Sequence, residues 1–200
     1  MPALKTDRTR RALLAAVAAA PLFLCGRALS AVWGIDALMA ELARTPASEV
    51  SFRETKYLAA LKTPLELQGT LKFQRPDHLE RHVSAPFEES FVVDGDRMTL
   101  ERKATGERHQ LLLQSQPVLW AFIESIRATL RGDLATLRKF YRVELAGTQA
   151  QWTMTLLPND VEMGQLVRVI RIGGRQGRVQ SIEVQETSGD RSITRIEEKR

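Results

Sequence analysis

The sequence has very little cysteine: its 200 residues contain one, Cys25. A single thiol excludes an intramolecular disulfide and a metal site built from cysteines. Acylation of Cys25 would anchor the N-terminus in a membrane, but a lipid-attachment cysteine follows a small residue and this one follows Leu24. We therefore expect an N-terminus without a lipid.

The usual catalytic motifs are missing as well. The sequence contains no Gly-x-Ser-x-Gly elbow and no His-Glu-x-x-His motif. His78 and His82 lie on a predicted strand, where a rise of about 3.3 Å per residue puts them roughly 13 Å apart, too far to share a metal ion. The adjacent Glu88 and Glu89 point to opposite faces of a strand. We expect no enzyme and no cofactor.

The first 30 residues are typical of a cleaved bacterial export signal. A basic segment covers residues 1–11, an apolar run covers 12–25, and Ala28-Leu29-Ser30 offers small residues to a signal peptidase. The apolar run is shorter than the about 20 residues that span a bilayer. The pair Arg10-Arg11 resembles a twin-arginine motif, so the Sec and twin-arginine routes both stay open. Either route predicts a periplasmic protein whose single mature domain is 31–200.

The mature part has almost no net charge. Residues 1–30 hold five of the 29 lysines and arginines and one of the 24 acids, which leaves 24 basic and 23 acidic residues. A nucleic-acid binder keeps a basic face. The mature chain has no such cluster, so we expect no nucleic-acid partner.

The hydrophobic pattern predicts a mainly β protein. Residues 65–74 alternate strictly between apolar and polar side chains, as in a strand with one dry face. Turn residues such as Asp94-Gly95 separate further short strands. The expected strands are 49–59, 65–75, 78–84, 88–93, 97–103, 107–113, 141–146, 150–157, 165–173, 178–187 and 191–198.

Helical spacing interrupts this pattern in three places. The expected helices are 32–43, a helix that Pro117 opens and Gly132 ends, and a helix from Asp133 to about Phe140. Eleven antiparallel strands with so few helices predict a strongly curled sheet whose concave face the helices cover. Periodicity leaves open whether that face is a packed core or a cavity beneath a helical lid.

Arg75 stands out because its parity places it on the dry face of the 65–75 strand. An arginine on an apolar face needs a partner, such as helix C-terminal carbonyls or a ligand head group. The alternative is that Pro76 ends the strand and Arg75 is solvated.

The segment 69–77, Gly-Thr-Leu-Lys-Phe-Gln-Arg-Pro-Asp, followed by Pro86 and by Val-Val-Asp-Gly at 92–95, resembles the periplasmic outer-membrane lipoprotein carrier family (LolA-like). The order of signal, helix, six strands, two helices and five strands is also similar. Leu79 and Arg81 stand where the family has an aromatic pair, which marks a divergent member.

The resemblance implies an open antiparallel half-barrel of about eleven strands with a helical lid over an apolar cavity. It implies a monomeric carrier that shields the acyl chains of lipoproteins, or of another lipid, between an inner-membrane ABC transporter and an outer-membrane receptor. Arg75 matches the family's lid latch. The candidate acyl-chain lining is Phe52, Leu67, Leu71, Phe73, Phe91, Met98, Leu100, Trp120, Phe122, Ile123, Ile126, Trp152, Met154, Ile182 and Val184.

Two other functions stay open. The same scaffold suits a lipid-sensing module that regulates a membrane partner, or an anchored acceptor at the outer membrane. The cargo also stays open between a lipoprotein and another lipid, such as a glycolipid or a polyene-linked lipid.

Overall fold

The computed structural model describes residues 33–46 and 48–197. Internal contacts divide the chain into Met1–Ala31 and Val32–Arg200. The expected export signal, residues 1–30, lies outside the described residues. The fold below is that of the second unit.

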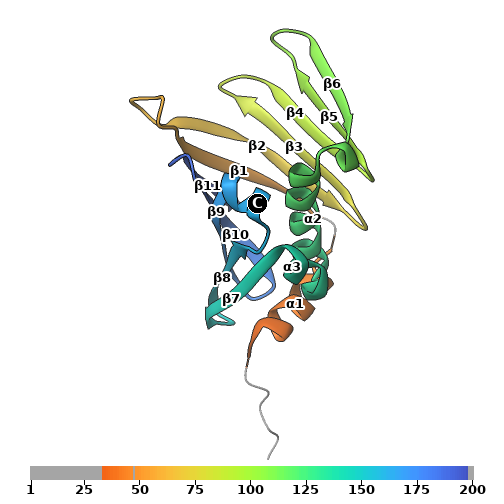
Figure 1. Ribbon diagram of the computed structural model, residues 1–200, viewed down its shortest axis with the longest axis vertical. Helices are drawn as coiled ribbons and strands as arrows, with labels where there is room; N and C mark the ends of the chain where they lie inside the picture. Colours follow the sequence, from red (N-terminus) through yellow and green to blue (C-terminus); the bar gives the residue numbers. More distant parts are fainter. Residues whose placement is uncertain (1–32, 47, 198–200) are drawn as a thin grey trace, which may run out of the picture. The chain divides into compact units, whose positions relative to one another are not determined.

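Eleven antiparallel strands form one sheet (Figure 1). The strands are β1 (Ser48–Tyr57), β2 (Leu65–Gln74), β3 (His78–Ala85), β4 (Glu89–Asp94), β5 (Arg97–Arg102), β6 (Glu107–Leu112), β7 (Tyr141–Thr148), β8 (Gln151–Pro158), β9 (Val167–Arg175), β10 (Arg178–Glu186) and β11 (Arg191–Glu197).

The strand order explains why the sheet stays open. It runs β6-β5-β4-β3-β2-β1-β11-β10-β9-β8-β7, with β6 and β7 at opposite edges. The chain therefore meanders outward from β1 to one edge, crosses to the other edge, and meanders inward until β11 pairs with β1. This confirms the expected open, curled antiparallel sheet of eleven strands.

The crossing from edge to edge is made by helices that lie over one face of the sheet (Figure 1). It consists of a 3-10 turn (Leu113–Ser115), α2 (Pro117–Arg131) and α3 (Leu134–Phe140). Gly132 ends α2 at φ +72°, and its N–H donates to the carbonyls of Ala128 and Thr129. The Asp133 carboxylate then accepts from the Thr136 N–H at 3.0 Å and caps α3.

The first helix, α1 (Ile35–Arg44), packs beside α2. Leu38, Met39 and Leu42 form its buried stripe. A Cβ at Gly132 would lie 2.1 Å from the Met39 carbonyl oxygen, so only glycine allows the two helices to approach this closely.

One helix was not expected. Residues 161–166 form α4 (Val161–Leu166), whereas the sequence pattern predicted a strand from 165. The Asp160 carboxylate caps α4 by accepting from the Met163 N–H at 3.0 Å. Six residues are too few for a helical period to appear in the sequence, so the expected start of the strand was wrong and β9 begins at Val167.

The hydrophobic core is divided between the two halves of the sheet. The largest cluster joins α1 and α3 to β7–β9 and includes the fully buried Trp152, Tyr141 and Met154. A second cluster joins α2 to β4–β5 through Ile123, Val93 and Met98. Helices thus pack directly on both halves of the concave face.

Candidate functional site

The concave face of the β1–β6 half can be followed through the strand register. One row crosses the sheet through Phe73, Leu79, Val93, Met98 and Leu111. Because members of this row pack against α2, this is the face that the helix covers.

The next row on the same face is Leu71, Arg81, Phe91, Leu100 and His109. Its apolar side chains are only partly buried. The row after that contains Phe52, Gly69, Val83, Glu89, Arg102 and Glu107. The concave face therefore changes from apolar to charged with distance from the first row.

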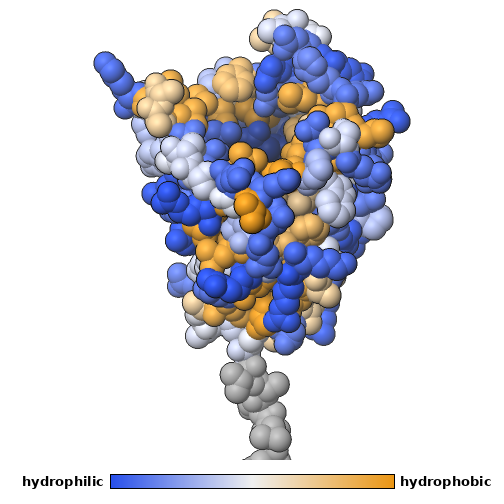
Figure 2. All heavy atoms as spheres, viewed as in Figure 1, coloured by the Kyte–Doolittle hydropathy of each residue, from blue (hydrophilic) through white to orange (hydrophobic). Residues whose placement is uncertain are grey.

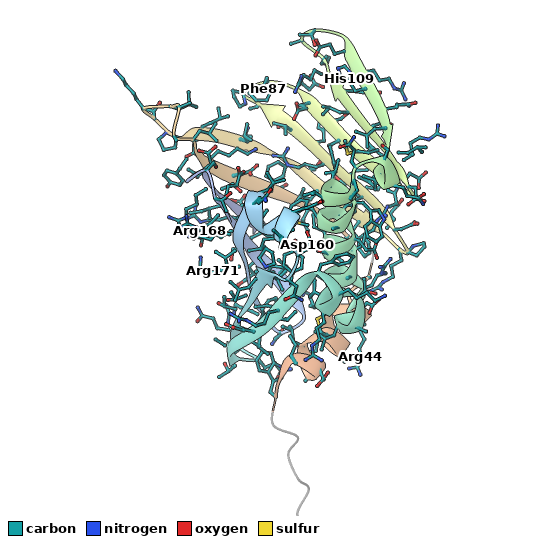
Figure 3. All side chains as sticks on the ribbon, in the orientation of Figure 1. Arg44, Phe87, His109, Asp160, Arg168 and Arg171 are labelled. Atoms are coloured by element: carbon teal, nitrogen blue, oxygen red, sulfur yellow. The ribbon has the colours of Figure 1, made fainter. Side chains whose placement is uncertain are left out.

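This half of the sheet is hollowed. Figure 2 shows a depression, bordered by hydrophobic residues and with hydrophilic atoms at its bottom, where Figure 1 places strands β1 to β4. Phe87, at the turn between β3 and β4, lies toward the same end of the sheet as His109 (Figure 3). Phe87, Tyr57 and Leu61 are exposed hydrophobic residues at neighbouring hairpin ends.

Of the fifteen predicted lining residues, twelve belong to or lie against three core clusters and three lie outside them. Trp152, Met154, Ile182 and Val184 belong to the packed core or lie against it. Met98, Phe91, Trp120, Phe122 and Ile123 lie where α2 meets the sheet, and Phe52, Leu67 and Leu71 form a small separate cluster. Phe73 is buried, and Leu100 and Ile126 are half-buried. The half-buried Leu71, Phe91 and Leu100 share one row on the concave face of the β1–β6 half.

Arg75 lies at the end of β2 where the ends of α1 and α2 meet. Its Nη2 is 3.3, 2.6 and 3.0 Å from the carbonyl oxygens of Leu42, Ala43 and Thr45, and 3.3 Å from that of Leu130. The guanidinium also stands over the Phe73 ring, 5.9 Å from its centroid. Arg75, which directly follows β2, thus bonds the C-terminal ends of two helices, where a cation interacts favourably with both helix dipoles.

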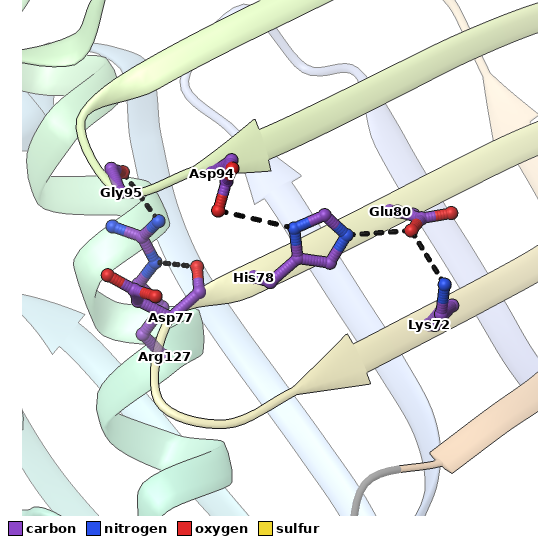
Figure 4. A network of polar contacts seen from close by, with 7 residues as sticks. All are labelled: Lys72, Asp77, His78, Glu80, Asp94, Gly95 and Arg127. Carbon is purple, nitrogen blue, oxygen red and sulfur yellow. Dashed lines mark hydrogen bonds and ion pairs between the residues drawn. The ribbon is translucent and has the colours of Figure 1, made fainter.

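A second arginine, Arg127, also connects α2 with the sheet. Arg75 reaches from the sheet to the helices, whereas Arg127 reaches from α2 to the sheet. Its Nε donates to the Asp77 carbonyl at 2.8 Å and its Nη2 donates to the Gly95 carbonyl at 2.7 Å (Figure 4). Burial lowers the pKa of this guanidinium, while Asp77 and Glu124 oppose that shift. Sequence reasoning missed Arg127 because a polar residue beside an apolar helical stripe is normally solvated.

The convex face carries a separate polar network at the same end of the sheet (Figure 4). His78 lies between Glu80, 2.6 Å from Nε2, and Asp94, 3.4 Å from Nδ1. Lys72 donates to Glu80 at 2.8 Å, and the hydrogen bonds from Lys72 and His78 lower the pKa of Glu80. This network ties β2, β3 and β4 together.

The concave face also holds a charged pair that was not predicted. Arg81 Nη2 donates to Glu54 Oε2 at 2.5 Å, and the Arg81 guanidinium lies 5.0 Å from the centroid of Phe52. Lys56 Nζ is 3.9 Å from the other Glu54 oxygen. The side chains of Glu54 and Arg81 are 8% and 27% exposed. Only the pairing of strands 27 residues apart brings these charges together.

Within residues 33–46 and 48–197, no cluster of histidine, cysteine or acidic side chains has the arrangement of a metal site. None of the helices in that part of the chain is long and apolar enough to cross a bilayer.

Comparison with solved structures gives several distant matches. A LolA superfamily protein from Nitrosomonas europaea has 6% identity and a TM-score of 0.45, over 84% of this chain and 95% of that chain. The Pseudomonas aeruginosa MucA/MucB complex has 11% identity and a TM-score of 0.44, over 81% and 55%. The Clostridioides difficile complex of the CwlD amidase with the GerS lipoprotein has 10% identity and a TM-score of 0.39, over 75% and 82%.

Sequence comparison decides the family. No curated protein sequence gives a significant match. The sequence profile described as outer membrane lipoprotein carrier protein LolA-like matches residues 27–197. Since that match spans most of the chain, the protein is a divergent member of the LolA-like family.

Proposed function

We propose that this protein is a periplasmic carrier that shelters the acyl chains of a lipoprotein or another lipid on the way from the inner to the outer membrane. Family membership supports the proposal. The observation that carries it is the open β1–β6 half, whose concave face keeps a row of half-buried apolar side chains beside the row that α2 covers.

The energetics favour a binding protein for this task. Each methylene removed from water contributes about 0.8 kcal/mol, so a long acyl chain exposed to water costs on the order of 10 kcal/mol. A hollow lined with Leu71, Phe91 and Leu100 would offset part of that cost without any chemical step. Residues 1–30 would direct the chain to the periplasm and be removed there.

The elements also provide a way to open the hollow. α2 packs on the sheet mainly along the Phe73 row, and two arginines hold it at the end near Asp77 and Gly95. Movement of α2 away from the sheet would enlarge the hollow without breaking the strand pairing. We propose that α2 is the moving lid and that Arg75 latches it when the carrier is empty.

The test is uptake of a fluorescent long-chain fatty acid by the protein purified from periplasm. Leu100 and Thr99 are adjacent half-buried residues of β5 that face opposite sides of the sheet. Leu100 belongs to none of the three core clusters, so its replacement should not unfold the protein. Leu100→Gln is expected to weaken uptake about tenfold, whereas Thr99→Gln should leave it unchanged.

The outcomes separate a carrier from a closed core. No uptake by the wild-type protein would contradict the proposal and would favour the alternative of a sensing module that regulates a membrane partner. Equal weakening by both substitutions would show that binding does not occur on the concave face.

A further inference from the structure

We propose that Arg81, held by Glu54 on the concave face, binds an anionic carboxylate or phosphate group of the carried lipid. This inference rests on the proposed function, and it names the chemical class of the cargo's polar part.

The location of the pair is the first reason. Arg81 lies in the row between Leu71 on β2 and Phe91 on β4, and Leu100 continues that row on β5. An anionic group at Arg81 would therefore have an apolar path beside it for the attached chain. An amphiphile needs this combination of one charge and adjoining apolar surface.

The charges of the site favour an anion. Arg81 and Lys56 bring two positive charges to the single negative charge of Glu54. The guanidinium has five N–H groups. Only Nη2 of Arg81 has a hydrogen-bond acceptor among the described residues, namely Glu54. Donors on Nε and Nη1 and the second N–H of Nη2 remain available for a carboxylate or phosphate, and a bidentate contact would pair Nη2 with either Nε or Nη1.

The third reason for the proposal is that burying the Arg81–Glu54 ion pair costs free energy. A buried ion pair generally stabilises a protein no better than apolar side chains of the same volume would. A hollow that held only acyl chains would be served better by two apolar residues at these positions. Glu54 keeps Arg81 neutralised and oriented in the empty protein, and an incoming anion would compete with it for the guanidinium.

The experiment compares three ligands of one chain length: tetradecanol, tetradecanoate and tetradecyl phosphate. Their dissociation constants are measured below micelle formation by displacement of a fluorescent fatty acid. We expect the wild-type protein to bind at least one of the anions about tenfold more tightly than the alcohol, a difference of about 1.4 kcal/mol. The relative affinity of the two anions then identifies the head group.

The variants locate the preference. Glu54→Gln removes the internal competitor, so it should tighten anion binding several-fold and leave alcohol binding unchanged. Glu54→Gln with Arg81→Gln removes both charges, which avoids an unpaired buried carboxylate, and should abolish the preference while alcohol still binds. Arg53→Gln, which removes a charge from the outer face of β1 where Arg53 pairs with Glu197 at 3.1 Å, should change nothing.

Each contrary result has one meaning. If the wild-type protein binds alcohol and anions equally, or if the preference survives in the double variant, the pair is structural only and the inference is overturned. If none of the three ligands binds, the carrier proposal itself fails, and this inference fails with it.

Discussion

Replacing Arg75 with leucine should loosen the proposed helical lid without unfolding the sheet. The four carbonyl oxygens around Nη2 belong to the ends of α1 and α2, at 2.6 to 3.3 Å. An Nη2 group has two hydrogens, so it makes about two good bonds at any time. Each such charge-assisted bond contributes about 1.5–3 kcal/mol when shielded, but this side chain is exposed and water can replace the protein as its partner.

We therefore expect a loss of about 1–2 kcal/mol, confined to the contact between the helix ends and the sheet. That loss raises the population of the open lid about 5- to 30-fold. Hydrogen–deuterium exchange measures it directly. Amides in residues 117–131 should exchange faster by this factor in Arg75→Leu, while amides in β8 and β9 keep their wild-type protection.

Arg44 provides the matched control. It lies in the last turn of α1 (Figure 3), and among the described residues its side chain has no hydrogen bond or ion pair. Arg44→Leu removes the same charge from the same region without touching α2, so exchange in α2 should hardly change. Equal acceleration by both variants, or acceleration of the whole sheet in Arg75→Leu, would refute the latch.

Three further predictions concern stability. Arg127→Met should lower the free energy of unfolding by about 3 kcal/mol, because the guanidinium is buried and makes two charge-assisted bonds to the sheet; an unchanged urea midpoint would contradict this. Gly132→Ala should destabilise by more than about 1 kcal/mol in thermal melts, since its Cβ would collide with the Met39 carbonyl and φ is positive. Glu80 has a folded-state pKa below its ordinary value of 4.5, first of all because Lys72 donates to it, so its stabilisation is present above about pH 4.5 and is lost as the pH falls below that value. Urea titrations between pH 3 and 7 should show a shallower acid loss in Glu80→Gln than in the wild type, and parallel curves would disprove that contribution.

The sheet could be predicted from the sequence because its signals are local. Strict alternation over residues 65–74 and glycines at turns such as Gly95 mark strands and hairpins without any long-range information. The family could also be predicted, because its motif around Arg75 is continuous in the chain. The match to the family profile confirmed that prediction. Among the described residues, the short α4 lacked a readable period.

The site was less predictable because it depends on pairing. The position of Arg75 raised the right question, but the pattern alone left its partner undecided among helix carbonyls, a ligand head group and solvent. The Arg81–Glu54 pair needs the register of β1, β2 and β3, which no local pattern contains. Likewise, the burial of Arg127 follows from where α2 lies over the sheet, rather than from the helical period.

The most direct test of the carrier account is native mass spectrometry of the protein purified from the periplasm of its own cells, followed by lipid extraction. The account predicts a bound acylated species, whose mass would distinguish a lipoprotein from a free lipid and whose head group would carry a carboxylate or phosphate. A protein that is recovered without lipid and that also takes up no fluorescent fatty acid would contradict the account.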